Sequence, residues 1–291
     1  MAKVLIIGSG PAGVSAALYA VRAGLETLVV SRGDGALAKA EHIENYYGLA
    51  VPMTGAELAA AGIAGAQRLG VKFVEDEIVW LGLKDTMQGF QVQSTGKTYE
   101  ADSVILAAGA SRQAPAIPGL KELEGRGVSY CAICDAFFYR GKEVAVLGAG
   151  EYALREAQTL LPHAAKVHVL TDGIEPLVDF PVPLIVHTEK LAVIQGDKRV
   201  LGVQFAGPTA ELPLAGVFVA YGTAGSVELA RKLGVALKGN SVAADAHMAT
   251  NVPGLFAAGD CTGGLLQVAK AVYEGAVAGL SAVQYVRQSR E

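Results

Sequence analysis

Five consecutive residues in the middle of the chain have the types and spacing for redox chemistry: Cys131-Ala132-Ile133-Cys134-Asp135. Two intervening residues hold the sulfurs close enough for an intramolecular disulfide, and a nearby helix start lowers a thiol pKa and raises its reactivity. Asp135 directly follows the second cysteine and is placed to move a proton. A metal site is disfavoured, because no second cysteine pair completes a Cys₄ set and the histidines lack zinc-finger spacing.

A glycine-rich turn near the start of the chain has the spacing that binds a dinucleotide. Gly8-Ser9-Gly10-Pro11-Ala12-Gly13 follows a short apolar strand. The first glycine permits the tight turn, the second lets a pyrophosphate approach the backbone, and the third lets the helix pack against the strand. The helix N-terminus then faces the phosphate. The next strand ends at Ser31, beside Arg32, where a carboxylate commonly binds the ribose; a hydroxyl can also hydrogen-bond a ribose.

A second glycine turn, Gly148-Ala149-Gly150-Glu151-Tyr152-Ala153, is a weaker match. The Glu151 carboxylate at the helix start satisfies free N–H groups and repels a pyrophosphate. The Tyr152 ring is expected where a nicotinamide would lie. The segment Leu170–Glu175 holds no Arg or Lys for the 2′-phosphate of NADPH, whereas Asp172 could bind the 2′-hydroxyl of NADH. A lost nucleotide site is the favoured interpretation, and an NADH site stays open.

Each glycine turn lies within a strand–helix–strand unit, so the sequence contains an internal repeat. The expected elements of the two units are strand Lys3–Ile7, helix Val14–Ala23 and strand Leu28–Val30, then strand Glu143–Leu147, a helix towards Leu161 and strand Val167–Leu170. Further expected elements are a strand from Ser103 towards Gly109, a proline-containing domain crossing at 114–119, a turn at Thr250–Gly254, a strand at Leu255–Ala258 and a last helix at Leu265–Gln288.

This order of elements predicts an α/β protein with two nucleotide-binding domains, Rossmann-like and three-layer ββα, the second inserted in the first. We expect the first domain at 1–112 and 242–291 and the second, which carries the cysteines, at 113–241. The length of 291 residues agrees with two domains, at roughly 150 residues each.

Composition excludes several classes of function. The chain has 24 basic and 28 acidic residues, a net charge of −4, which argues against broad nucleic-acid binding. No apolar stretch of about 18 residues is free of Gly, Pro and charge, so no membrane span is expected. The first apolar run is too short for a signal peptide. Three cysteines do not make a secreted disulfide framework, so we expect a cytoplasmic protein.

Taken together, the motifs resemble those of the low-molecular-weight thioredoxin reductase family nearly from end to end. They are Gly8–Gly13, Ile43-Glu44-Asn45-Tyr46, Ile117-Pro118-Gly119, Gly125-Arg126-Gly127-Val128-Ser129-Tyr130 leading into the cysteine motif, Phe137-Phe138-Tyr139-Arg140, and Pro253-Gly254-Leu255-Phe256-Ala257-Ala258-Gly259-Asp260.

The resemblance implies FAD as the cofactor, held by the first domain. The implied cofactor-binding residues are Gly8, Ser9, Gly10, Pro11, Ala12, Gly13, Ser31, Asn45, Val79, Gly109, Gly259, Asp260, Gln267 and Val268. The implied catalytic residues are Cys134, which faces the flavin, Cys131, which attacks the disulfide of thioredoxin, and Asp135, which donates or accepts a proton. Arg126, Phe137 and Phe138 are implied at the thioredoxin-docking surface. The resemblance also implies a homodimer whose domains rotate between the two half-reactions.

Departures from the family pattern bear on the electron donor. Leu170-Thr171-Asp172 replaces the usual His-Arg-Arg that binds the NADPH phosphate, Ala36 replaces a flavin-contacting Gln, and Leu266 replaces an Arg. These departures resemble the ferredoxin-dependent flavin thioredoxin reductases, which keep FAD and the cysteine pair without pyridine nucleotides. Since a flavin accepts electrons singly or in pairs, two ferredoxin encounters can replace one hydride. Cys261 is an extra thiol, interpreted as a small buried residue.

Three alternatives stay open beside a ferredoxin-linked thioredoxin reductase. The first keeps the enzyme and takes NADH or NADPH as the donor. The second is an FAD-dependent dithiol oxidase that oxidises a small dithiol. The third is a flavin-bound redox sensor whose disulfide regulates a partner without turnover. A sensor does not need Asp135, so Asp135→Asn discriminates between turnover and sensing.

Overall fold

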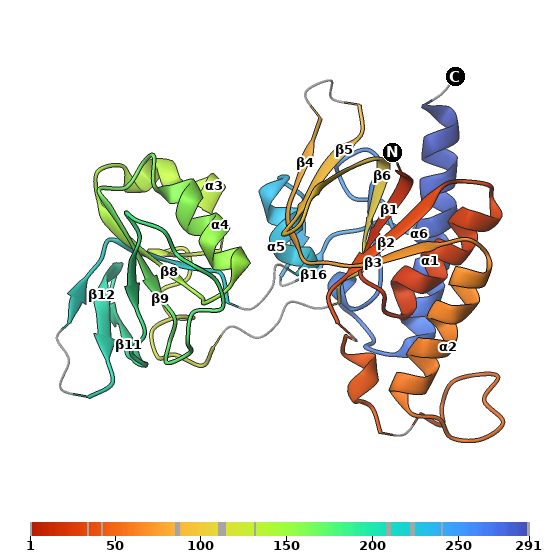
Figure 1. Cartoon of the computed structure of the whole chain (residues 1–291), viewed down its shortest axis with the longest axis horizontal. Helices are drawn as coiled ribbons and strands as arrows, with labels where there is room; N and C mark the ends of the chain where they lie inside the picture. Colours follow the sequence, from red (N-terminus) through yellow and green to blue (C-terminus); the bar gives the residue numbers. More distant parts are fainter. Residues whose placement is uncertain are drawn as a thin grey trace. The chain divides into compact units, whose positions relative to one another are not determined.

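The fold is described from a computed structural model, and the chain divides into two compact units (Figure 1). Unit 1 comprises Met1–Ser111 and Gly225–Glu291, and unit 2 comprises Arg112–Ala224. The structure describes residues 2–33, 35–41, 43–84, 88–109, 115–130, 132–207, 211–221, 225–239 and 241–289. Within these ranges, no helix combines the length and apolar character needed to cross a membrane.

Unit 1 is built on a seven-stranded sheet with the order β3-β2-β1-β6-β5-β4 and β17 paired to β6. Its strands are β1 (Ala2–Ile7), β2 (Thr27–Ser31), β3 (Lys72–Glu75), β4 (Ile78–Leu83), β5 (Phe90–Ser94), β6 (Thr98–Leu106) and β17 (Leu255–Ala257). A small hairpin, β15 (Leu237–Lys238) with β16 (Ser241–Val242), completes the strands. The pairs among β3, β2, β1, β6 and β17 are parallel, and β5 runs antiparallel to both β4 and β6.

The helices of unit 1 are α1 (Pro11–Arg22), α2 (Gly55–Arg68), α5 (Ser226–Lys232) and α6 (Val268–Gln288), with short 3₁₀ turns η1 (Leu37–Lys39) and η3 (Asp260–Thr262). The buried core joins the parallel strands to α1, α2 and α6 through side chains such as Ile6, Ala16, Ala66 and Ala278. These helices lie together beside the parallel strands (Figure 1). The alternation of a short apolar strand and an Ala-rich helix produces this layering, because each element buries one apolar face.

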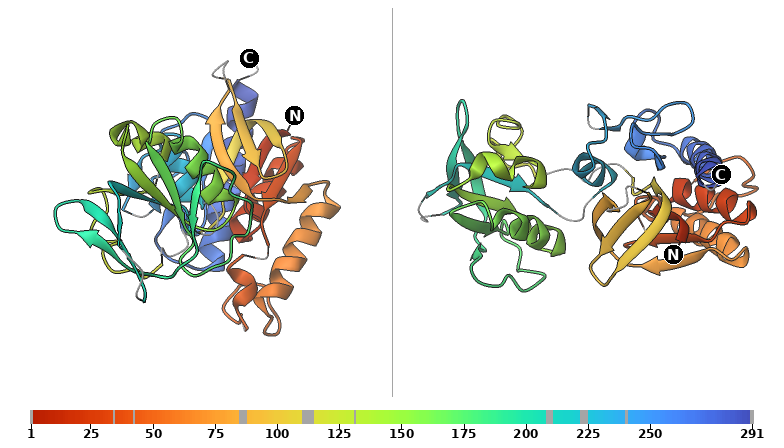
Figure 2. Two further views of the ribbon diagram at one scale, coloured as in Figure 1. Left: turned by 60° about the vertical axis from the view of Figure 1, so that its left-hand side comes forward. Right: turned by 90° about the horizontal axis from the view of Figure 1, so that it is seen from above.

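Helix α6 lies against α1 although the two are separated by most of the chain (Figures 1 and 2). The approach is close: a Cβ on Gly275 would lie 2.1 Å from the backbone oxygen of Ala12. The Ser15 hydroxyl on α1 also donates to the Val272 carbonyl on α6, at 2.7 Å. Small residues on both helices therefore bring the starts of α1 and α6 into one region.

Unit 2 contains a five-stranded parallel sheet with the order β10-β9-β8-β14-β7 and a three-stranded antiparallel sheet, β11-β12-β13. Its strands are β7 (Val128–Ser129), β8 (Glu143–Leu147), β9 (Lys166–Leu170), β10 (Ile185–His187), β11 (Leu191–Gly196), β12 (Val200–Phe205), β13 (Leu212–Pro213) and β14 (Gly216–Val219). The helices are α3 (Ala132–Asp135), η2 (Ala136–Tyr139) and α4 (Glu151–Leu160). Buried residues of β8, β9 and β14 pack with those of β11 and β12, among them Leu147, Leu170, Val217 and Ile194.

The expected fold class is confirmed, and so are the strand–helix–strand elements around both glycine turns. Helix α6 begins at Val268 rather than at Leu265, because Gln267 has an extended backbone, with φ of −138°. The second domain boundary is expected at 241/242 from the sequence, whereas the compact unit 1 resumes at Gly225. Two hydrogen bonds explain this, from the Ala108 amide to the Ser226 hydroxyl and from the Lys232 ammonium to the Val79 carbonyl.

Candidate active site

The first glycine turn joins β1 to α1 and has the geometry expected of a phosphate-binding turn. A Cβ on Gly13 would lie 1.9 Å from the carbonyl oxygen of Gly8, so glycine is needed where the helix meets the strand. Gly10 is the N-cap of α1, with Pro11 next and neither a side-chain cap nor an acidic residue in the first turn. Around a Cβ on Gly10, no described atom lies within 4 Å. The helix start is therefore open and electropositive, as a pyrophosphate requires.

Other predicted cofactor residues gather around this turn. A Cβ on Gly8 would lie 2.3 Å from the Ala107 carbonyl oxygen at the end of β6, and β6 leads to Gly109, whose φ is 76°. A Cβ on Gly259 would lie 2.9 Å from the Cβ of Ala12. Segments from both ends of unit 1 therefore border the same turn.

Asn45 and Gln267 are brought together from distant parts of the sequence. The Asn45 side-chain amide donates to the Gln267 side-chain oxygen, at 3.1 Å, and both residues are exposed. Gln267 is the N-cap of α6 and directly precedes Val268, the first helical residue. Exposed side-chain amides of this kind can donate to and accept from a ligand.

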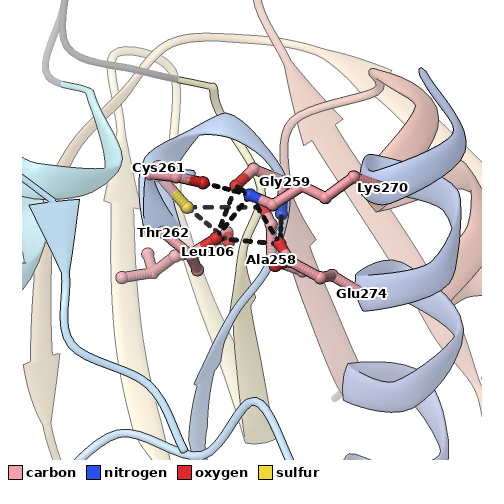
Figure 3. Close-up of polar contacts among 8 residues, drawn as sticks. Leu106, Ala258, Gly259, Cys261, Thr262, Lys270 and Glu274 are labelled. Atoms are coloured by element: carbon pink, nitrogen blue, oxygen red, sulfur yellow. Dashed lines mark hydrogen bonds and ion pairs between the residues drawn. The ribbon is translucent and has the colours of Figure 1, made fainter. Parts of the chain in front are cut away.

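Lys270 and Glu274, which the sequence analysis did not select, hold the turn that carries Asp260 (Figure 3). The Lys270 ammonium donates to the carbonyls of Gly259 and Gly263 at 2.7 and 2.6 Å and to the Thr262 hydroxyl at 2.8 Å. Glu274 lies 3.0 Å from the same ammonium and accepts from the Gly259 amide at 2.8 Å. Both glycines have a positive φ, 86° and 76°, which orients their carbonyls for this contact.

A sequence signal for this pair did exist. Lys270 and Glu274 are the charged residues of the first two turns of α6, four positions apart, and most of their neighbours in these turns are small or apolar. Their side chains are only 15% and 12% exposed, so the pair is a largely buried anchor rather than a solvated surface pair.

Cys261 is buried beneath this turn, as the sequence predicted for a small buried residue. Its thiol contacts the carbonyls of Leu106 and Ala258 at 3.4 and 3.3 Å (Figure 3). Burial raises the pKa of the Cys261 thiol to about 11, against a partial opposing effect of the Ser226 hydroxyl. A neutral, enclosed thiol of this kind is not a nucleophile.

Ser31 and Val79 have structural contacts of their own. Ser31 ends β2, and its carbonyl accepts from the Asp76 amide at 2.9 Å. The adjacent Arg32 is held by Glu77 at 2.6 Å. Val79 is buried in β4 and contacts α5 through its carbonyl. The binding roles of Ser31 and Val79 stay predictions.

The second glycine turn differs from the first because a later segment of its own unit contacts it. The Leu177 amide donates to the Ala149 carbonyl at 2.8 Å, and a Leu177 methyl would lie 3.8 Å from a Cβ on Gly150. Tyr152 is 1% exposed, so its ring is enclosed by the protein rather than facing an open site. The turn that matches the nucleotide-binding spacing less well is therefore also the less accessible one.

Asp172, which could bind the ribose of NADH, is engaged within unit 2. Its carboxylate accepts from the Leu191 amide at 2.9 Å and lies 3.7 Å from the Lys190 ammonium. It is 5% exposed, and its φ of 54° places the residue in a tight turn after β9. A buried carboxylate already occupied by backbone and ammonium donors is poorly placed for a ribose.

The predicted dithiol lies partly outside the described residues: Cys131 is not among them, and for Cys134 only the backbone within α3 is described. Asp135 ends α3 and is half-buried; its carboxylate accepts from the Ser129 hydroxyl at 2.7 Å. Burial, with a smaller effect of the Asp135 charge, raises the pKa of Tyr139. A fixed carboxylate beside the cysteine motif is consistent with the predicted proton-transfer role.

Glu156 of α4 is a further residue at this motif that the sequence analysis missed. It is 3% exposed, and its Oε2 accepts from the Ala132 amide at 2.8 Å. No local sequence pattern could have found this contact, because it joins two helices through a backbone amide. Within the described residues, no group of three or more His, Cys, Asp or Glu side chains could hold a metal ion.

The residues implied at a docking surface include two exposed phenylalanines. Phe137 and Phe138 are 65% and 68% exposed and lie edge to face, with ring centroids 6.2 Å apart. The Arg140 guanidinium lies over the Phe137 ring, 4.8 Å from its centroid. Arg126 is bound to the carbonyls of Glu122 and Asp197. The aromatic pair is therefore available to a partner, whereas Arg126 is held by its own chain.

One α/β unit has an open dinucleotide-binding turn, and the sequence of the second unit carries a cysteine pair. This combination is typical of a dinucleotide-binding disulfide oxidoreductase. In agreement, the family model "pyridine nucleotide-disulphide oxidoreductase" matches residues 2–275. A thioredoxin reductase of Listeria innocua is 34% identical over 310 residues, covering 99% of this chain and 95% of the relative. The chain belongs to the low-molecular-weight thioredoxin reductase family.

Solved structures give the same family, and the description of one of them names ferredoxin. The atypical thioredoxin reductase TRi from Desulfovibrio vulgaris Hildenborough superposes with a TM-score of 0.92 at 38% identity, covering 99% of both chains. A ferredoxin-flavin thioredoxin reductase from Clostridium acetobutylicum has a TM-score of 0.72 at 32% identity, covering 99% of this chain and 98% of that one. FAD is the cofactor of this family and of this chain. The open turn at Gly10 fits its pyrophosphate.

Proposed function

We propose that this thioredoxin reductase passes electrons from FAD through a Cys131–Cys134 disulfide to thioredoxin and receives them from ferredoxin. The observation that carries the donor assignment is the contrast between the glycine turns. A Cβ on Gly10 would meet no described atom within 4 Å, whereas the turn at Gly150 is contacted by Leu177, whose amide also donates to the Ala149 carbonyl. Asp172 is engaged elsewhere, and no Arg or Lys follows β9 in Leu170–Glu175 to bind a 2′-phosphate.

FAD supplies a carrier that takes up electrons singly or in pairs. The protein's part is the thiol chemistry. The Cys131 thiolate attacks a sulfur of the thioredoxin disulfide, so an S–S bond to Cys131 forms and a thioredoxin thiolate leaves. Cys134 then attacks the Cys131 sulfur, releases reduced thioredoxin and re-forms the internal disulfide. Asp135, held by Ser129, accepts and returns the proton at Cys134.

The docking surface of this proposal includes Phe137 and Phe138, because two exposed rings provide the apolar area on which a protein partner can pack. A homodimer is part of the proposal as well. Tyr273 and Leu280 are 63% and 54% exposed and lie seven positions apart on α6, hence on one face of the helix. A cytoplasmic location also belongs to the proposal, since a dithiol centre of this kind works in a reducing compartment.

An anaerobic titration of the FAD-loaded protein tests the donor. Reduced ferredoxin, NADH and NADPH are added separately, and flavin absorbance is followed. Bleaching by ferredoxin alone supports the proposal, and rapid bleaching by either nicotinamide nucleotide contradicts the donor assignment. An oxygen-coupled dithiol oxidase would instead show flavin reduction by a small dithiol and reoxidation by oxygen at a steady rate.

The roles of the two cysteines have their own test. Cys134→Ser removes the resolving thiol, so a mixed disulfide between Cys131 and thioredoxin should accumulate on non-reducing gels. Cys131→Ser is the matched variant and should give no such complex. A complex with the second variant and none with the first would reverse the assignment.

A further inference from the structure

A buried carboxylate lies at the start of the cysteine helix. Glu156 is on the second turn of α4, is 3% exposed, and accepts a hydrogen bond from the Ala132 amide at 2.8 Å. Ala132 is the first residue of α3 and is covalently joined to Cys131. The contact therefore ties α4 to the backbone between the two predicted redox sulfurs.

The Ala132 amide matters for thiol chemistry because backbone N–H groups at a helix start stabilise a neighbouring thiolate. When Glu156 occupies this N–H group, the amide is taken up by the carboxylate. The charged and titratable groups of the surrounding elements are Asp135 on α3, Tyr139 on η2, and Glu151, Tyr152 and Arg155 on α4. Of these, Asp135 already accepts from Ser129.

We propose that Glu156 is a positioning residue that keeps the Cys131–Cys134 couple strongly reducing by opposing thiolate formation at Cys131. The inference rests on the proposed redox role of the two cysteines. The Glu156 carboxylate contacts the amide of the residue that is bonded to Cys131, so its charge disfavours a Cys131 thiolate, and so does the loss of that amide as a donor to the sulfur. Couples whose reduced form is stabilised by a low thiol pKa are oxidising, so the opposite arrangement favours the disulfide and makes the dithiol a better donor.

The exchange of electrons and protons takes place between the cysteine pair and the thioredoxin disulfide. Reduction breaks the Cys131–Cys134 bond and consumes two electrons; with two protons it gives two thiols, and with one proton it gives a Cys134 thiol and a Cys131 thiolate. Oxidation by the thioredoxin disulfide returns the same electrons and protons to thioredoxin. Glu156 takes no electrons; it changes the relative free energies of thiol, thiolate and disulfide through its charge and its contact with Ala132. A strongly reducing Cys131–Cys134 couple suits an enzyme that must deliver electrons to another disulfide.

Glu156→Gln tests the proposal, because glutamine keeps the shape and an acceptor oxygen but removes the charge. The FAD-loaded protein is equilibrated in dithiothreitol redox buffers, and each cysteine is quantified by alkylation and peptide mass, which separates Cys261 from the pair. At about pH 10, where a thiol of ordinary pKa is ionised, we expect the equilibrium to move about tenfold towards the reduced pair, which makes the potential about 30 mV less negative for a two-electron couple. The pKa of the Cys131 thiol, from the pH profile of alkylation, should fall by about one unit.

Two further variants separate charge from architecture. Glu151→Gln removes the same charge from the first turn of the same helix and should leave the equilibrium within twofold of the unaltered protein. Glu156→Asp keeps the charge with a shorter reach and should shift the equilibrium less than Glu156→Gln. An unshifted Glu156→Gln, or an equal shift for Glu156→Asp, would overturn the inference. If the unaltered pair does not titrate between disulfide and dithiol at all, the proposed function fails instead.

Discussion

Replacing Lys270 by Met is expected to cost more free energy of FAD binding than free energy of unfolding of the flavin-free protein. The ammonium makes three hydrogen bonds to the Gly259–Gly263 turn and an ion pair with Glu274. Removing one partner of a buried pair costs about 3–5 kcal/mol. Because the two side chains retain 15% and 12% exposure, water recovers part of this, and we take about 3 kcal/mol, the lower end.

The part of this cost that appears as lost FAD affinity depends on whether FAD binding requires the native conformation of the turn that carries Asp260. If the bound cofactor must restore the whole arrangement, about 3 kcal/mol corresponds to roughly a hundredfold higher Kd. The assay is titration of flavin-free protein with FAD by flavin fluorescence, together with urea unfolding of the same flavin-free sample. Met keeps an unbranched side chain only one atom shorter than that of Lys while removing the charge.

The control is Lys72→Met in the same unit. Lys72 pairs with Glu26 at 3.1 Å, but the two side chains are 69% and 49% exposed, and such pairs contribute about 0–1 kcal/mol. We expect its FAD affinity to match that of the unaltered protein. A Lys270→Met variant with unchanged FAD affinity would refute the reasoning, because the turn would then be held by its glycines and Glu274 alone.

Three further expectations concern the stability of unit 2, the reactivity of the Cys261 thiol and the Gly8–Gly13 turn. Burial lowers the pKa of both His168 and His187, so below about pH 6.5 the unfolded chain binds more protons than the folded one. The free energy of unfolding should therefore fall as the pH drops from about 7.5 to about 5.5, and equal urea midpoints would contradict this. Cys261, with its pKa raised to about 11, should resist iodoacetamide in the native state and react after unfolding; modification of the native protein would show that the turn opens. Gly13→Ala places a Cβ 1.9 Å from the Gly8 oxygen and should lower the flavin-to-protein absorbance ratio, whereas full flavin content would show that the helix can shift.

Local patterns in the sequence predicted the parts of the fold that local physics decides. The Gly8–Gly13 turn was identified correctly because its glycines, its strand and its helix are contiguous. The return to unit 1 at Gly225 was missed, because it depends on contacts of Ser226 and Lys232 with residues more than a hundred positions away.

In the candidate site, too, local patterns were predictable from the sequence and long-range contacts were not. The meeting of Asn45 with Gln267 was anticipated only through family resemblance, since nothing local relates two residues 222 positions apart. Glu156 could not be predicted for a different reason. Its partner is a backbone amide, which every residue except proline has, so the type of residue 132 does not indicate the contact. Asp172 had a plausible binding role in sequence, and only the structure reveals that the Leu191 amide occupies it.

The pairing of α1 with α6 has a consequence for how the protein is made. The FAD turn precedes α1, while the turn held by Lys270 precedes α6, and unit 2 is encoded between them. A ribosome that has finished unit 2 has therefore released only part of unit 1, without the helix that packs on Ala12 and Ser15. Unit 2 can fold during synthesis, whereas the first-made residues must wait for the last-made helix. Cofactor loading thus follows the synthesis of α6, and a nascent chain stalled before α6 should carry no flavin.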